Sequence, residues 1–195
     1  MSVRFDARTA MNIAHKFATY DDLLALPENR VGEIIHGKLY SQPRPRPRQV
    51  RASTRVGARL DGPFDLGEGG PGGWWILDEP ELHLGGDVLV PDLAGWKRER
   101  MPRLPDAAWF ELAPDWVCEV LSPSTARTDR VLKLPRYAAE GVAHCWLIDP
   151  DARTLEAYEN QSGRWLLLGA WAEAETPRAP PFDAIALPLS SLWAD

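Results

Sequence analysis

The fold is decided by residues 115–150, which read DWVCEVLSPSTARTDRVLKLPRYAAEGVAHCWLIDP. Residues 115–121 are apolar on both faces of an extended chain, which is typical of a central strand. Residues 128–140 predict a helix that ends at Gly141, and residues 142–148 form a second apolar run. The order strand, helix, strand predicts a crossover between two parallel strands. We therefore expect a mixed sheet and an α/β or α+β fold.

The preceding residues alternate between short helices, turns and strands. Helices are expected at residues 19–27 and 48–60, a β-hairpin at residues 30–40, and strands at residues 74–77, 81–84 and 87–96. In the helix of residues 48–60, Val50, Val56 and Leu60 are expected to face inward. Thr128-Asp129 is expected to begin a helix. His36-Gly37 is expected to form the turn of the hairpin.

Length and composition are those of one globular domain. The chain has 195 residues, of which 45% are hydrophobic and 26% charged. Residues 1–17 show no clear period and are expected to form an arm before a single domain at 18–195. No apolar run approaches the ~18 residues of a membrane helix, so no membrane partner and a cytoplasmic location are expected.

Positive charge is concentrated in one segment. The net formal charge is −6, yet residues 44–59 contain six arginines and no acidic residue, which leaves −12 on the rest of the chain. If the chain acts on DNA, this segment is expected to contact the backbone rather than bases. The candidate residues are Arg48, Arg51, Arg55 and Arg59. The alternative is a solvated helix face that acidic residues elsewhere in the fold balance.

Glu119 interrupts the most apolar strand of the sequence. It shares a strand face with Val117 and Leu121. Burying an unpaired carboxylate costs several kcal/mol, so Glu119 must be paired, protonated or bound to a cation. The alternative is a glutamate at a strand end that reaches water or an arginine.

Asp92 is the second carboxylate within an apolar run, directly after Pro91. Taken by itself, an aspartate directly after a proline is typical of a turn. Two carboxylates on neighbouring strands, with a backbone carbonyl beside one of them, form a site of oxygen ligands that suits Mg²⁺, or Mn²⁺ in its place. Such an ion activates water and neutralises charge on a phosphate.

Lys133 is one of only four lysines, and it lies on the helix that follows Glu119. Its ammonium is expected to reach back over the end of the strand, where it would orient water or stabilise a phosphorane. The alternative is a solvated helix lysine.

Several motifs occur together in this chain. They are residues 90–93 (VPDL), residues 117–125 (VCEVLSPST), Asp129, Lys133, Tyr137 and residues 141–150 (GVAHCWLIDP). This set resembles the Uma-type restriction endonucleases of bacteria, which belong to the PD-(D/E)XK nuclease superfamily. The resemblance extends over about residues 20–158 and is most specific over residues 115–150.

The resemblance implies a restriction-endonuclease-like core, in which a central mixed sheet flanked by helices holds a divalent metal. By this resemblance Asp92 and Glu119 are metal ligands, and Glu33 matches a further acidic position. The usual lysine two residues after the second acid is replaced by Leu121, and Lys133 takes over its role.

Three other positions of the family pattern are also matched or altered. Gln49 stands where the family often has a histidine. Asp129 is expected to cap the helix that carries Lys133, and Tyr137 is expected to pack one turn beyond it. The chain has no phosphate-binding GxxxxGK[ST] or GxGxxG motif, so no nucleotide cofactor is expected.

These observations predict a Mg²⁺-dependent DNA endonuclease with Asp92, Glu119, Lys133 and Glu33 in its active site. Cutting both strands with one site per chain predicts a two-fold homodimer. The alternative is a catalytically inactive nuclease fold that binds DNA or another protein, which the acidic net charge, Leu121 and Gln49 favour. An RNA or small phosphodiester substrate remains open.

Overall fold

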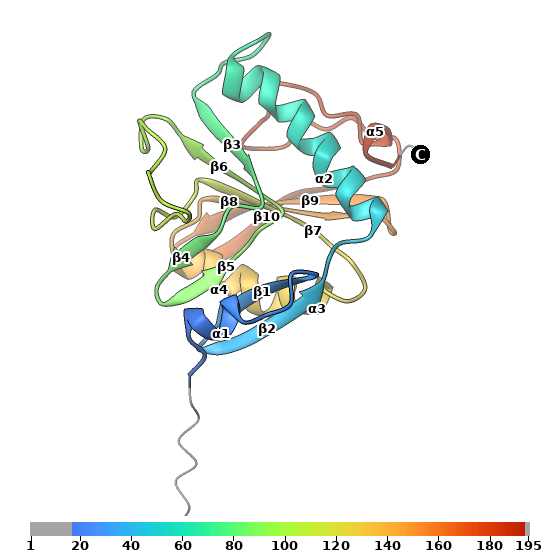
Figure 1. Cartoon of the computed structure of the whole chain (residues 1–195). Helices are drawn as coiled ribbons and strands as arrows, with labels where there is room; N and C mark the ends of the chain where they lie inside the picture. Colours follow the sequence, from blue (N-terminus) through green and yellow to red (C-terminus); the bar gives the residue numbers. More distant parts are fainter. Residues whose placement is uncertain (1–16, 194–195) are drawn as a thin grey trace, which may run out of the picture.

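The computed structural model describes residues 17–193, and the expected arm at residues 1–17 lies almost entirely outside them. Two sheets organise the chain (Figure 1). The larger has the order β10-β9-β8-β7-β6-β3, formed by Arg164–Ala172, Thr154–Gln161, His144–Asp149, Trp116–Val120, Leu93–Lys97 and Trp74–Asp78. The smaller has the order β2-β1-β5-β4, formed by Lys38–Pro43, Arg30–Ile35, Asp87–Leu89 and Leu82–Leu84.

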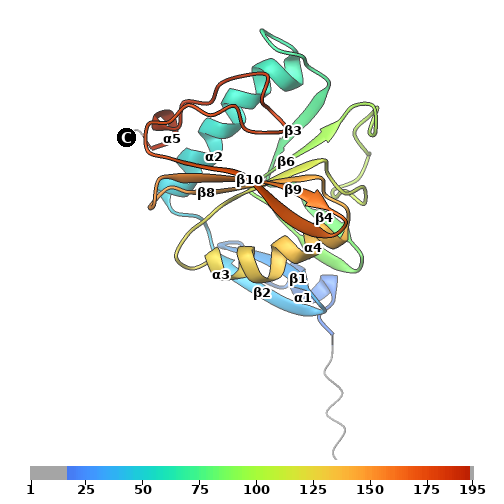
Figure 2. The same ribbon diagram turned by 180° about the vertical axis from the view of Figure 1, so that it is seen from behind.

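Helices cover both faces of the larger sheet (Figures 1 and 2). On one face lie α2 (Pro47–Leu60), the π-helical η1 (Asp61–Leu66) and α5 (Ser190–Trp193). On the other lie the smaller sheet with α1 (Tyr20–Leu24) and the continuous helical segment α3 (Ala126–Thr128), η2 (Asp129–Lys133) and α4 (Leu134–Ala139). The mixed α+β architecture agrees with the expected fold class.

The crossover predicted from residues 115–150 is confirmed. Strand β7 pairs in parallel with β8, with Glu119 opposite Leu147, and the segment α3-η2-α4 connects them. Gly141 ends α4 at a φ of 82°, in the left-handed region that favours glycine. The expected hairpin is also present, with His36 and Gly37 both at positive φ in its turn.

Strand β7 separates two hydrophobic clusters. Trp116, Cys118 and Val120 pack with α2 and the C-terminal segment. Val117 and Leu121 pack with the smaller sheet and α4. Glu119 shares the second face, as alternation along a strand requires, and it therefore points between the two sheets.

The prediction of one strand at residues 87–96 is wrong. The chain forms β5, breaks at Val90-Pro91-Asp92, and continues as β6 in the other sheet. Proline has no N–H to give to a ladder, which permits this break. The backbone of the neighbouring Val90 bonds to side chains instead of to another strand. Its N–H donates to Glu33 Oε1 at 2.8 Å, and its carbonyl accepts from Lys133 Nζ at 2.9 Å.

The helix α2 begins and ends close to its predicted bounds, but its inner face differs from the prediction. Val56 and Leu60 are fully buried as expected, whereas Val50 is 47% exposed. The buried face consists of Gln49, Ala52, Ser53, Val56 and Leu60, a stripe with the spacing of a helix. No helix within residues 17–193 is long and apolar enough to cross a membrane.

Candidate active site

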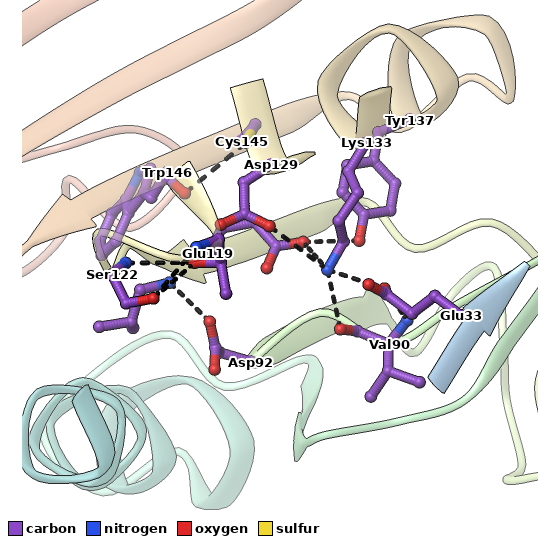
Figure 3. Close-up of polar contacts among 12 residues, drawn as sticks. Glu33, Val90, Asp92, Glu119, Ser122, Asp129, Lys133, Tyr137, Cys145 and Trp146 are labelled. Atoms are coloured by element: carbon purple, nitrogen blue, oxygen red, sulfur yellow. Dashed lines mark hydrogen bonds and ion pairs between the residues drawn. The ribbon is translucent and has the colours of Figure 1, made fainter. Parts of the chain in front are cut away.

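Lys133 lies at the centre of a buried polar cluster between the two sheets (Figure 3). Its side chain is 1% exposed, and its Nζ lies 2.8 Å from Glu119 Oε1 and 2.9 Å from Glu33 Oε1. It also donates to the carbonyl oxygen of Val90 at 2.9 Å. The alternative of a solvated lysine is therefore wrong, because this lysine joins β1, the Val90 linker and β7.

Asp92 lies beside this cluster, at the point where the chain enters β6. Its Oδ2 accepts a hydrogen bond from the N–H of Val120 at 2.6 Å, which fixes the carboxylate against the end of β7 (Figure 3). Asp92 directly precedes β6, Glu119 lies in the antiparallel neighbour β7, and both line the same cavity. The structure brings together all four residues expected at the site: Glu33, Asp92, Glu119 and Lys133.

Two further residues join the cluster in roles that differ from their predicted ones. Asp129 does not cap the helix, because Thr125 is the N-cap of α3; its carboxylate is buried, lines the cavity and lies 3.9 Å from Lys133 Nζ. Tyr137 does more than pack, since its hydroxyl donates to Glu119 Oε1 at 2.7 Å. Asp129, Lys133 and Tyr137 follow one another at intervals of four residues, which places them on one face of a helix. This spacing is visible in the sequence and could have linked the three residues before the structure was known.

The cavity has a volume of about 180 Å³. Its lining includes the carboxylates of Asp92, Glu119 and Asp129 and the ammonium of Lys133, and Ser122, Ser124 and Thr125 line it after β7. Arg44, Arg46 and Gln49 also line it. The Nε2 of Gln49 donates to the carbonyl oxygen of Leu121 at 3.4 Å, and its buried Oε1 has no hydrogen-bond partner.

The acids of the cluster outnumber its bases. Glu33, Asp92, Glu119 and Asp129 surround one ammonium, so full ionisation gives a net charge of −3. Burial raises the pKa of Asp92 to about 7 and raises the pKa values of Glu119 and Asp129, with the Lys133 charge opposing the shift. Burial lowers the pKa of Lys133, but attraction to Glu119, Glu33 and Asp129 outweighs it and raises the pKa overall.

The excess negative charge fits a divalent cation. Within residues 17–193 no three Asp, Glu, His or Cys side chains form a ready cage for a metal. An ion in this cavity would be held by one or two carboxylates, with water completing its shell, and this is the arrangement that Mg²⁺ favours. Asp92 and Glu119 are both carboxylates that line this cavity.

The four arginines predicted to contact DNA differ in how far they are exposed to solvent. Arg48, Arg51 and Arg59 are exposed, whereas Arg55 is half-buried and its Nε has no hydrogen-bond partner. Arg48 lies 3.5 Å from Asp151 Oδ1. Arg44 and Arg46, which belong to the same basic segment and precede α2, line the cavity that holds the carboxylates.

Comparisons with known proteins identify the family and support the fold. The Uma2 family, described as "Putative restriction endonuclease", matches residues 17–190. A solved structure titled as a "putative nuclease belonging to DUF820" from Anabaena variabilis ATCC 29413 is 25% identical, with a TM-score of 0.72 over 90% of this chain and 97% of that one. No curated protein matched the chain. The match over nearly the whole described chain shows that this protein belongs to the Uma2 family.

Proposed function

We propose that this protein is a metal-dependent DNA endonuclease. The observation that carries the proposal is the contact of Lys133 Nζ with Glu119, in the same cavity as Asp92. Two carboxylates and one lysine in a hollow between sheets are the parts needed for hydrolysis of a phosphodiester by water. The family description and the similar nuclease structure support the same class of reaction.

Asp92 and Glu119 are the residues that would hold Mg²⁺ or Mn²⁺. Bound there, such an ion would make a water more acidic and offset the charge of the scissile phosphate. Asp92 is oriented for this by the Val120 N–H, and Glu119 by the Tyr137 hydroxyl. These two hydrogen bonds fix each carboxylate before substrate arrives, which limits the reorganisation needed on binding.

Lys133 supplies positive charge beside Glu119, where it would orient the attacking water or stabilise the phosphorane. Glu33 acts as a positioning residue, because its Oε1 contacts Lys133 Nζ and also accepts from the Val90 N–H. Leu121 is 2% exposed and belongs to the apolar cluster under α4. The ammonium of Lys133 thus reaches Glu119 from the helix, so Leu121 alone does not favour the catalytically inactive alternative.

The test is nicking of supercoiled plasmid by the purified protein with Mg²⁺ or Mn²⁺, and again with EDTA. We expect nicking that EDTA abolishes, and a loss of at least about 100-fold in Asp92→Asn, Glu119→Gln and Lys133→Met, since removing one electrostatic group from an active site costs on this order. Each variant is assayed at a temperature at which circular dichroism shows that it is folded. Lys38→Met is the matched control, because Lys38 is exposed on β2.

Each outcome of this test separates the candidates. Equal nicking by wild type and all variants would mean that a contaminant cuts the plasmid. A wild type that shifts DNA on a gel but never nicks it would favour the binding module. A wild type that degrades RNA and leaves DNA intact would move the proposal to an RNA substrate.

We also propose that two copies act together on duplex DNA, because one site per chain cuts one strand at a time. In light scattering on the protein with a short duplex, the complex should have the mass of two chains plus one duplex. Double-strand breaks should then appear without accumulation of nicked circles at high protein concentration. A complex with the mass of one chain plus one duplex would contradict this expectation.

A further inference from the structure

Two further hollows lie beside the carboxylate cavity, along the first turns of α2. A second hollow, lined by Arg46, Pro47, Arg48, Gln49 and Asp151, shares Arg46 and Gln49 with that cavity. A third hollow of about 400 Å³ shares Pro47 and Arg48 with the second. The three hollows therefore lie next to one another along the N-terminal part of α2.

We name the third hollow the arginine hollow. Its wall includes Arg48, Arg51, Arg153, Leu192 and Trp193. These residues come from α2, from the turn between β8 and β9, and from α5. Both views of the molecule show α5 and the ends of β8 and β9 beside the N-terminal end of α2 (Figures 1 and 2).

The chemistry of the arginine hollow suits a nucleotide. Three guanidinium groups provide planar, forked donors of the kind that bind phosphate. The first turn of α2 contains no acidic residue, and no side chain caps its N-terminus, so the positive end of the helix adds to this field. Leu192 and the indole of Trp193 provide an apolar and aromatic wall, and Trp193 Nε1 is fixed by donation to the Glu173 carbonyl at 2.8 Å.

Arg153 occupies a backbone position that favours glycine. Its φ is 54°, in the left-handed region. Its guanidinium lies 3.2 Å from Glu173 Oε2, an exposed pair that contributes little to stability. A large cationic side chain is thus kept at a strained turn position, and it faces the hollow.

We propose that the arginine hollow binds an unpaired nucleotide of the DNA strand that leaves the carboxylate cavity. Arg48, Arg51 and Arg153 hold its phosphate, and its base stacks on Trp193. A positive groove with an aromatic platform is how proteins bind single strands, since every base has a face that can stack. The proposal rests on the proposed nuclease function and refines its substrate to DNA with a single-stranded flank.

The experiment measures the affinity of the full chain for fluorescent DNA by anisotropy, in EDTA so that no cleavage occurs. The two probes are a blunt duplex and the same duplex with an unpaired flank of about ten nucleotides, within the range that single-strand binding sites cover. We expect wild type to bind the flanked duplex about tenfold more tightly than the blunt one. We expect Trp193→Ala and Arg153→Gly to lose that preference and to keep their affinity for the blunt duplex.

Arg153→Gly separates binding from folding. Because glycine relieves the left-handed strain, its melting temperature should equal or exceed that of wild type while the preference is lost. Ser162→Gly is the matched backbone control, since Ser162 also has a φ of 54°, in the turn between β9 and β10. Arg103→Gly is the matched charge control, because Arg103 lines a separate hollow.

The outcomes distinguish this inference from the proposed function. If wild type nicks plasmid but binds blunt and flanked duplexes equally, the single-strand site is wrong and the nuclease proposal stands. The same conclusion follows if Trp193→Ala and Arg153→Gly keep the preference of wild type. If wild type neither nicks nor binds DNA, the proposed function fails and this inference falls with it.

Discussion

Asp92 shows how a single residue links stability to the proposed chemistry. Its carboxylate is held by the Val120 N–H, and its pKa rises to about 7 from an ordinary value of 3.8 because burial disfavours the charged form. The folded protein therefore retains a proton that the unfolded chain has already lost over this range. Stability contributed by the protonated form is lost as the pH rises from about 3.8 to about 7.

We predict that Asp92→Asn is more stable than wild type in EDTA, and increasingly so at higher pH. Asparagine can still accept from the Val120 N–H but carries no charge. The gain in the free energy of unfolding should grow by on the order of 1–2 kcal/mol between about pH 5.5 and about pH 8. Urea unfolding at the two pH values measures it.

The exposed Asp78 at the end of β3 provides the control, and Asp78→Asn should change stability by less than about 0.5 kcal/mol at either pH. Addition of Mg²⁺ at about pH 8 should narrow the gap between wild type and Asp92→Asn, because an ion that binds the folded state stabilises it. An Asp92→Asn variant that is less stable than wild type at both pH values would contradict this account.

At the same scale, the sequence predicted four residues that the structure brings together, but not all of their partners. Glu119 and Asp92 were identified because a carboxylate within an apolar strand demands a partner. Asp129 and Tyr137 were underrated, because a helix start and a packed ring each explain those residue types without a site. The structure brings both into the cluster, with Asp129 in the π-helical turn η2 and Tyr137 in α4.

At the scale of elements, the helix α2 provides a matched pair of valines. Val56 is fully buried against the larger sheet, and Val50 is 47% exposed. We predict that Val56→Ala lowers the free energy of unfolding by roughly 1.5–3 kcal/mol, because two buried methyl groups are lost and a cavity remains. Val50→Ala should change it by less than about 0.5 kcal/mol.

Chemical denaturation of both variants measures the difference, with the same two atoms removed in each case. Similar losses in the two variants would show that α2 is rotated from the orientation described. The sequence pattern alone placed Val50 inward, because an apolar residue near the helix start was assigned to the core. The adjacent Gln49 is buried instead, with its amide directed to the Leu121 carbonyl.

The strand predicted at residues 87–96 shows why element order can be predicted more readily than sheet membership. The residues on both sides of Pro91 are apolar and fit one strand. Periodicity does not report which neighbours a strand pairs with, and here β5 pairs with β1 and β4 while β6 pairs with β3 and β7. The crossover was predictable because its two strands and its helix are contiguous in the sequence.

At the scale of the whole molecule, segregation of charge should control binding to DNA. The net charge of −6 hides the positive segment at residues 44–59. If the four arginines Arg44, Arg46, Arg48 and Arg51 each contact a phosphate, the logarithm of affinity should fall with the logarithm of salt concentration with a slope of about −3.6. The affinity then falls roughly 100-fold for a fourfold rise in salt.

Anisotropy measured over a series of salt concentrations gives this slope. The double variant Arg46→Ala and Arg48→Ala should reduce it by about 1.8, because two phosphate contacts are lost. Arg103→Ala should leave it unchanged. A slope near zero in wild type would mean that the acidic surface prevents the proposed contacts.

The linker Val90-Pro91-Asp92 carries the chain from one sheet to the other, and Lys133 bonds to the linker and to both sheets. The same ammonium that is proposed for catalysis therefore fastens the halves of the molecule together. Loss of Lys133 would leave buried carboxylates facing one another without compensation, which destabilises a fold strongly. Selection for folding alone would thus preserve this lysine, even in a descendant that no longer cuts, and its presence in a relative is weaker evidence of activity than an intact pair of Asp92 and Glu119.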